Sequence, residues 1–195
     1  MDTITGGKFP TGGVVKLNIH SNKIGYIKFA NGTKIYAVDG IIDTIWSGAE
    51  MGCTFYIQKG VSYIDIDENC SLKGDIKINS TSSVYAAFCN YLTGINAPSA
   101  PNFGVIFCSY LTSFSAPLST NTSTYGCSSL SQQSIYNAFD NAFILLNNGY
   151  NNGVLNFGGS TPAIDDTEIS PVHSISYEAM AVIFAAHGWS ITYNS

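Results

Sequence analysis

The sequence predicts a mostly β fold with some α-helix: a short solenoid of 19-residue coils between an N-terminal β segment and a helix-backed C-terminal cap. Four cysteines recur at a constant spacing, short apolar–polar alternations precede them, and helix signals follow them. A coil this short cannot bury its apolar positions alone, so each must stack on its neighbours around a shared core. We therefore expect three parts: residues 1–50, 51–130 and 131–195.

The repeat, aligned on its cysteines, reads C-x-x-L-x-x-[I/F]-x-A-P. The recurring positions are Cys70, Cys89, Cys108 and Cys127, then Leu72, Leu92, Leu111 and Leu130, then Ile76, Ile95 and Phe114, then Ala97 and Ala116, and finally Pro98 and Pro117. This register resembles the BspA-type leucine-rich repeats, whose copies read roughly AF-x-x-C-x-x-L-x-x-I-x-x-P. The resemblance rests here on Ala87-Phe88-Cys89 and Phe107-Cys108. It covers residues 70–130 and implies a leucine-rich-repeat-like solenoid, for which we expect one strand per coil.

Residues 1–50 have the period-two pattern of β-strands in the runs 14–19, 24–29 and 34–38. Asn31-Gly32 separates the last two runs and predicts a β-hairpin with a type I′ turn. Two roles fit this segment. It is either a cap that covers the open edge of the solenoid, which we favour, or a separate attachment module. The strand-like pieces between residues 54 and 79, beginning with 55–57, are interpreted as irregular first coils.

After Cys127 the repeat is followed by helix signals. Ser129-x-x-Gln132 has the form of a capping box, and Gly149 supplies a C-cap. The apolar face of the helix between them consists of Ile135, Phe139, Ala142, Phe143 and Leu146. The segments that follow are a strand at 154–157, a tight glycine-rich connection at 158–166, a helix at 177–186 ended by Gly188, and a last strand at 189–193. We interpret the helices as replacing the loop before each strand.

Charge is scarce and unevenly placed along the chain. Only 11% of residues are charged, there is no arginine, and all eight lysines lie between Lys8 and Lys77. Binding to nucleic acid depends on Lys and Arg side chains that neutralise phosphates, so we expect no nucleic-acid partner and no anionic membrane surface. No run approaches the about 18 apolar residues of a membrane span, which predicts no membrane insertion. The first residues also lack the basic and apolar regions of a secretory signal.

The sequence assigns no catalytic, cofactor-binding or metal-binding residue, and we expect no cofactor. The cysteines, Cys53 included, are predicted to be buried thiols. Equivalent residues of neighbouring coils lie about 4.8 Å apart, whereas the Cβ atoms of a disulfide lie about 3.8 Å apart. No zinc-binding spacing is present. Asp65, Asp67 and Glu68 lack the loop glycine and further ligands of a calcium site, so we interpret them as a solvated turn.

The remaining candidates for chemistry are three histidines and three acids. They are His20, His173 and His187, and Asp165, Asp166 and Glu168. No histidine has a nucleophile and an orienting group in a recognisable arrangement, and His187 fits the ordinary place of a histidine at a helix C-terminus. The acids are neighbours in sequence and are interpreted as solvated, although a glycosidase also needs two nearby carboxylates. We therefore predict that the chain is not an enzyme.

Aromatic side chains are the better functional lead. Tyrosines and abundant Asn, Ser and Thr suit contact with sugars or with a protein surface. The tyrosines of the repeat are Tyr85, Tyr91, Tyr110 and Tyr125, with Tyr91 and Tyr110 in equivalent positions. Two interpretations remain open: half-buried rims between coils, which we favour, or a binding stripe.

The chain ending, from GVLNFGGSTPAIDD through HGWSITYNS, resembles the segments that follow BspA-type repeats in proteins from bacteriophages and prophages of gut Bacteroidetes. That resemblance implies a structural or recognition role. We expect a non-enzymatic virion component at a tail or fibre position, a homo-oligomer or partner of other virion proteins that contacts a glycan or protein of the host surface. The alternatives are a leucine-rich-repeat adhesin of the bacterial cell surface and, third, a carbohydrate-active enzyme.

Overall fold

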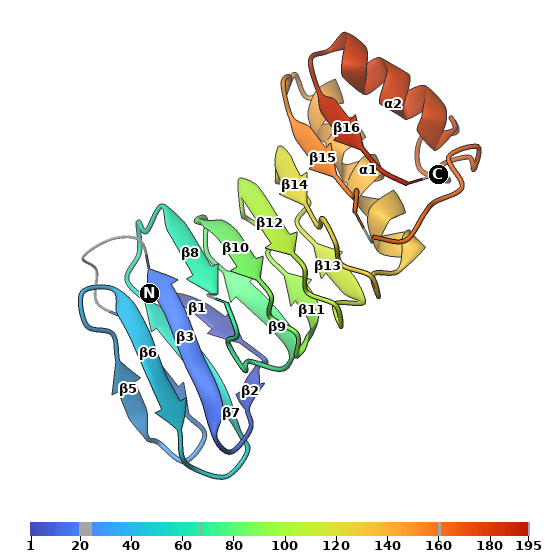
Figure 1. Ribbon diagram of the computed structural model, residues 1–195. Coiled ribbons are helices and arrows are strands. Elements are labelled where there is room, and N and C mark those ends of the chain that lie inside the picture. The colour runs from blue at the N-terminus through green and yellow to red at the C-terminus, as the bar shows by residue number, and fades with distance from the viewer. Residues whose placement is uncertain (20–24, 67, 160, 195) are drawn as a thin grey trace.

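The computed structural model describes residues 1–19, 25–66, 68–159 and 161–194. The molecule is elongated, with the N-terminus near one end and the C-terminus at the other (Figure 1). Two eight-stranded sheets extend along it, and the apolar core lies between them. The predicted fold class, a mostly β solenoid of about 19-residue coils with C-terminal helices, is confirmed.

The first sheet consists of β1 (Asp2–Thr5), β2 (Lys8–Phe9), β4 (Gly25–Phe29), β5 (Lys34–Tyr36), β7 (Met51–Ile57), β9 (Gly74–Asn79), β11 (Leu92–Asn96) and β13 (Ser113–Ser115). Its strand order is β13-β11-β9-β1-β7-β4-β5, with β2 also paired to β7. The second sheet consists of β3 (Gly13–Ile19), β6 (Ile41–Trp46), β8 (Tyr63–Ile66), β10 (Ser83–Ala87), β12 (Asn102–Ile106), β14 (Asn121–Ser123), β15 (Val154–Asn156) and β16 (Ser190–Thr192). Its strand order is β16-β15-β14-β12-β10-β8-β3-β6.

The middle of the molecule consists of parallel coils in which equivalent residues pair. In the first sheet Ile95 pairs with Ile76 and with Phe114, and in the second sheet Phe103 pairs with Val84. Each coil contributes one strand to each sheet, so the expectation of one strand per coil is wrong. A 19-residue coil is long enough for two short strands joined by turns, and each strand buries its inward side chains against the other sheet.

The N-terminal strands continue both sheets in the antiparallel direction. β1 lies between β9 and β7, and β3 lies between β8 and β6. The predicted piece 55–57 lies in β7, which pairs antiparallel with β4, so its interpretation as a first coil is wrong. Parallel pairing begins instead at β8, because only from there does the chain return to the same end of the sheet with each coil.

The predicted β-hairpin is confirmed, since β4 pairs with β5, but its turn is not type I′. A type I′ turn needs positive φ at both central residues. Gly32 has φ +90°, whereas Asn31 is not among the residues with positive φ. The Gly32 amide donates to the Phe29 carbonyl, and the Asn31 side chain accepts from the Thr33 amide. The loop is a type I turn followed by a left-handed glycine, the usual longer hairpin connection.

At the C-terminal end, α1 (Gln132–Asn147) and α2 (Tyr177–Ala186) alternate with β15 and β16. β14, β15 and β16 pair in parallel, so the second sheet continues to the end of the molecule. The first sheet stops at β13, and α1 packs against that strand. The helices therefore replace strands of the first sheet, and not the loops before strands as the sequence suggested (Figure 1).

Helix α2 and its C-terminal Gly188, with φ +78°, are as predicted. Gly149 follows α1 with φ +91°, also as predicted. The capping box at Ser129 is wrong, because the N-cap is Ser131, whose hydroxyl accepts from the Ser134 amide. Gln132 reaches away from the helix start and donates to the carbonyl of Ala163. Ser131 therefore caps the helix with its own hydroxyl, and Gln132, which was expected to complete the capping box, makes a tertiary contact instead.

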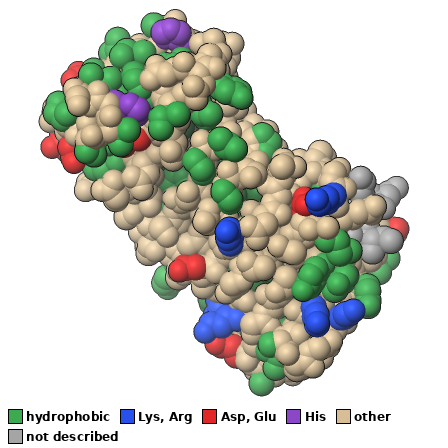
Figure 2. All heavy atoms as spheres, turned by 180° about the vertical axis from the view of Figure 1, so that it is seen from behind, with side chains coloured by type: hydrophobic (Ala, Val, Ile, Leu, Met, Phe, Trp, Pro, Cys, Tyr) green, Lys and Arg blue, Asp and Glu red, His purple; other side chains and the backbone are tan. Residues whose placement is uncertain are grey.

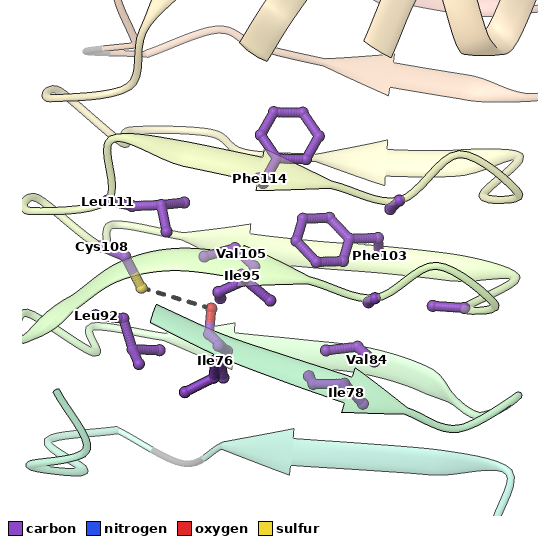
Figure 3. Packing of buried hydrophobic residues seen from close by; sticks show 14 of the residues in the cluster. Ile76, Ile78, Val84, Leu92, Ile95, Phe103, Val105, Cys108, Leu111 and Phe114 are labelled. Atoms are coloured by element: carbon purple, nitrogen blue, oxygen red, sulfur yellow. Dashed lines mark hydrogen bonds between the residues drawn. The ribbon is translucent and has the colours of Figure 1, made fainter. Parts of the chain in front are cut away.

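All five cysteines are buried thiols that form no disulfide, as predicted. Their thiols donate to carbonyls of the preceding coil: Cys89 to Ile66 at 3.4 Å, Cys108 to Ala86 at 3.9 Å and Cys127 to Val105 at 3.3 Å. Figure 3 shows the bond from Cys108 beside the stacked core side chains. Burial raises the pKa of Cys53 and Cys127 to about 12, so these thiols are neutral and unreactive at physiological pH.

Candidate interaction surface on the turn edge of the solenoid

Each coil passes from the second sheet to the first through a residue that directly precedes the repeat cysteine. This position is occupied in turn by Asn69, Phe88, Phe107 and Gly126, and all four have left-handed backbones with φ between 52° and 75°. Gly and Asn adopt this conformation readily, whereas a bulky side chain there meets the neighbouring carbonyl oxygen. Two phenylalanines therefore occupy a position that the coil geometry reserves for smaller residues.

Phe88 and Phe107 stack on each other along the solenoid axis. Their ring centroids are 5.1 Å apart with an interplanar angle of 17°, and the rings are 40% and 41% exposed. The ring of Tyr125 meets the other side of Phe107 edge-on at 5.5 Å. Gly126 leaves room for this arrangement, because a Cβ at that position would lie 2.5 Å from the Phe107 ring.

Tyr91 and Tyr110 lie on the same turns, three residues after Phe88 and Phe107. They are 55% and 64% exposed, more than the half-buried rim that we favoured. With Phe88, Phe107 and Tyr125 they form the aromatic band of the solenoid. The turns that carry them contain no charged residue. Neighbouring turns are linked by the side-chain oxygen Oδ1 of Asn90, which accepts from the Ser109 hydroxyl in the next turn at 3.0 Å.

Tyr85 differs from the residues of the aromatic band. It lies half-buried on the outer face of β10, where its ring stacks on Tyr63 at 6.3 Å. A Cβ at Gly104 would lie 2.9 Å from the Tyr85 ring, so the absence of a side chain at this position of the next coil makes room for the ring. For Tyr85 the interpretation as a rim between coils is confirmed.

The glycine-rich segment of the C-terminal region supports the aromatic band. A Cβ at Gly159, which has φ +70°, would lie 2.8 Å from the Tyr125 ring. The Gly126 amide donates to the Gly158 carbonyl, which brings the segment against the last turn of the repeat. Glycine is therefore required at position 159, where the backbone passes close to the Tyr125 ring. This agrees with the predicted tight connection.

The histidines considered from the sequence lie in separate places. The His173 ring nitrogen Nε2 is 3.1 Å from the backbone oxygen of Asp140, and His187 ends α2 with Nδ1 2.9 Å from the Ile183 carbonyl. His20 lies outside the described residues. Ser170 does not contact His173 as a nucleophile contacts its base, because the Ser170 hydroxyl donates to the Asp140 carboxylate at 2.7 Å.

The acids considered from the sequence are engaged in local or structural contacts. Asp165 accepts from the Thr167 hydroxyl at 2.6 Å, and Asp166 accepts from Tyr193 at 3.2 Å. Of the suggested calcium ligands, Asp67 lies outside the described residues. Within the described residues, no three His, Cys, Asp or Glu side chains gather as metal ligands would, and neither helix is long and apolar enough to cross a membrane.

Only part of the aromatic band could be predicted from the sequence. The equivalence of Tyr91 and Tyr110 follows from the repeat, and so does that of Phe88 and Phe107. The left-handed backbone at the phenylalanines follows from no local signal, although Asn69 and Gly126 at the same repeat position indicate it in retrospect. No family model, curated protein or solved structure matches the chain.

Proposed function

We propose that the chain is a non-enzymatic structural component of a bacteriophage virion, at a tail or fibre position, and that the aromatic band binds other virion proteins. The observation that carries the proposal is the exposure of five aromatic rings along one edge of a rigid solenoid. Aromatic residues are enriched in the cores of protein interfaces, where they provide most of the binding energy. The resemblance of the repeat and of the chain ending supports the virion setting.

The backbone at Phe88 and Phe107 supports a role in contact rather than in stability. A non-glycine residue with a left-handed backbone costs about 1–2 kcal/mol. Stacking of two aromatic rings returns about 0.5–1.5 kcal/mol. Asn69 and Gly126 make the same turn with smaller residues. The fold of the isolated chain thus gains little from phenylalanine at this position, and a partner that covers the rings supplies the missing stabilisation.

The neutral surface supports the same function. Figure 2 shows one face of the molecule, on which charged side chains are few and lie mostly toward the two ends. The eight lysines all belong to the N-terminal part of the sequence. A contact made through aromatic rings and uncharged polar groups depends on shape complementarity and changes little with ionic strength. This suits permanent assembly better than electrostatic capture of a mobile partner.

The proposal is tested with particles purified from a host that expresses either the wild-type chain or Phe88→Asn/Phe107→Asn. Mass spectrometry of the particles should find the wild-type chain at stoichiometric copy number. The double variant should be depleted at least about tenfold, the effect of losing about 1.4 kcal/mol of contact energy. Its unfolding midpoint should stay close to wild type, because asparagine suits the left-handed turn.

Tyr150→Asn is the matched control, since Tyr150 is 53% exposed but lies outside the aromatic band. It should enter particles like the wild type. If the wild-type chain is absent from particles, the virion placement fails, and labelling of intact bacterial cells then tests the adhesin alternative. If the double variant enters particles normally, the aromatic band is not the assembly surface.

A further inference from the structure

A cleft lies where the first sheet ends and α1 begins. Its volume is about 230 Å³, and its walls are formed by β13, by the turn after β13, by β14, by α1 and by Val172. Neighbouring strands lie about 4.8 Å apart, whereas a helix with its side chains is about 10–12 Å thick. α1 therefore cannot pack on β13 as closely as another strand would. The cleft results from the replacement of a strand by a helix.

The floor of the cleft is apolar and its walls are polar. Phe114 lies at the helix end of the stacked core side chains in Figure 3, and it forms the floor together with Ala116 and Ala138. The polar residues that line the walls are Ser115, Ser119, Thr122, Ser134, Asn137, Asp140 and Asn141. No lysine is among the described residues that line the cleft.

Thr122 brings a polar group to the cleft from the second sheet. It occupies an inward position of β14, where it pairs with Phe103 of one neighbouring coil and Leu155 of the other. Thr122 is 3% exposed as a residue, and its hydroxyl makes no hydrogen bond to any described residue, but that hydroxyl is not a fully buried atom, unlike the hydroxyl of Thr124. Thr122 also lines the cleft. Its hydroxyl is therefore open to a hydrogen-bonding molecule, to which a valine of the same shape would offer no polar group.

Asn141 lies in the opposite wall on α1, and its amide also makes no hydrogen bond to the described residues. By contrast, Asn137 one turn earlier accepts a hydrogen bond from Gln133 at 2.9 Å. The hydroxyls of Ser119 and Ser134 are similarly engaged, with the carbonyl of Asn121 and with Ser131. Two walls of the cleft thus each provide a polar side chain that has no hydrogen-bond partner among the described residues.

We propose that this cleft binds one unit of a neutral sugar. Hydroxyl and amide groups both donate and accept, which matches the hydroxyls of a sugar ring. The small apolar floor suits the C–H face of the ring. A liquid water occupies about 30 Å³, so the cleft has room for several waters or for one ring of this size. The inference goes beyond the virion proposal, because it holds wherever the chain acts.

The charges around the cleft select against an acidic sugar. Asp140 lies in its wall, and its carboxylate accepts from Ser170 at 2.7 Å and from Tyr177 at 3.5 Å. Among the described residues that line the cleft, none is basic and could neutralise a bound carboxylate or phosphate. An anion would lose its hydration without gaining a counter-charge, which is unfavourable. A neutral hexose or N-acetylhexosamine unit avoids this cost.

The test uses saturation-transfer-difference NMR on the full chain with glucose, galactose, mannose, N-acetylglucosamine and glucuronate. At least one neutral sugar should give a signal, and glucuronate should give none. Thr122→Val keeps the shape of the side chain and removes the hydroxyl. It should weaken binding about fivefold or more, the effect of one lost hydrogen bond. Asn141→Ala should weaken binding by a similar factor from the opposite wall.

Thr124→Val is the matched control. Thr124 is also a buried threonine whose hydroxyl has no partner in the described residues, two residues further along the chain, but it does not line the cleft. This variant should bind the sugar like the wild type. The proposal is overturned if no neutral sugar gives a signal, if glucuronate binds equally well, or if the signal persists unchanged in both Thr122→Val and Asn141→Ala.

Discussion

The two ends of the solenoid close the same pair of sheets by different physical means. At the N-terminal end, β1 and β3 add to β9 and β8 in the antiparallel direction, so main-chain hydrogen bonds make the closure. At the C-terminal end, α1 covers β13, so side-chain packing closes the first sheet, while the second sheet continues to its edge strand β16. An exposed sheet edge presents a row of unpaired amides and carbonyls, and the two ends treat the edge of the first sheet differently.

The difference lies in what each closure leaves exposed. At the N-terminal end β5 and β6 become the new edges, with Tyr36 and Ile45 59% and 65% exposed. At the C-terminal end the helices bury an aromatic cluster instead, and a cleft remains beside the covered strand. Closure by strands packs tightly but creates new sheet edges at β5 and β6. Closure by α1 ends the first sheet and leaves the cleft beside β13.

The largest expected effect comes from breaking the helical closure at Phe139. Its ring is fully buried and contacts those of Phe157, Tyr177 and Phe184. Phe139→Ala should lower the free energy of unfolding by about 3–5 kcal/mol, because the cavity cannot collapse within a packed aromatic cluster. Urea denaturation measures the loss.

Phe9→Ala provides the matched change at the other end, where Phe9 is fully buried against Phe29 and Phe55. Because coils contact only their neighbours, each variant should lose hydrogen-exchange protection mainly at its own end. Equal loss of protection along the whole chain in both variants would contradict this comparison and show that the two ends unfold as one unit.

The thiols give a second comparison of the two ends. Cys53 lies in β7, paired with β4 on one side and bonded to Gly7 on the other, whereas Cys127 lies in the turn before α1. Native protein should resist iodoacetamide at pH 8. Under mild denaturant, mass spectrometry should find Cys127 labelled before Cys53, because local opening of a helix breaks fewer sheet hydrogen bonds. Labelling of Cys53 before Cys127 would contradict this prediction and show that the N-terminal end opens more easily.

The same thiols determine an alkaline limit of stability. Burial raises the pKa of Cys53 and Cys127 from 9.0 to about 12. Their contribution to stability is complete below pH 9, where the thiols are protonated in both states. It falls as the pH rises from 9 toward 12, because only the unfolded chain ionises over that range. Unfolding midpoints measured across this range should decrease, and a constant midpoint would contradict the burial of the thiols.

The smallest expected effect is at the surface of the N-terminal closure. Glu50 Oε1 lies 3.2 Å from Lys8 Nζ, and Oε2 contacts Lys73 Nζ. Hydrogen bonds from Lys73 and Lys8 lower the pKa of Glu50 below 4.5. The ion pairs of Glu50 with Lys8 and Lys73 stabilise the fold above pH 4.5. This contribution is lost as the pH falls through the lowered pKa of Glu50.

Glu50→Gln should therefore change the unfolding midpoint slightly at low salt and neutral pH, because exposed ion pairs contribute little. The difference from wild type should vanish in high salt, where the charges are screened. Gln133→Ala on the exposed face of α1 is a control without charge, and its effect should not depend on salt. A large effect of Glu50→Gln that persists in high salt would show that these side chains do more than pair charges.

Much of the fold was predictable because it depends on local or strictly periodic signals. The repeat cysteines fixed the coil length, and the inward leucines and isoleucines indicated the core. The bounds of α2 followed from its helical pattern and from Gly188. The start of α1 was misplaced by two residues, because Ser129-x-x-Gln132 has the form of a capping box, whereas Ser131 caps the helix and Gln132 donates to the distant Ala163 carbonyl.

By itself, then, the sequence determined that 19-residue coils stack, that their cysteines are buried, and that helices end the molecule. Only the tertiary structure decided that each coil has two strands, that Phe88 and Phe107 take left-handed backbones, and that Thr122 faces a cleft. Periodicity reports which side chains are apolar and how often they recur. It does not report which partner a strand pairs with or how closely a helix approaches a sheet edge, because both depend on residues far apart in the chain.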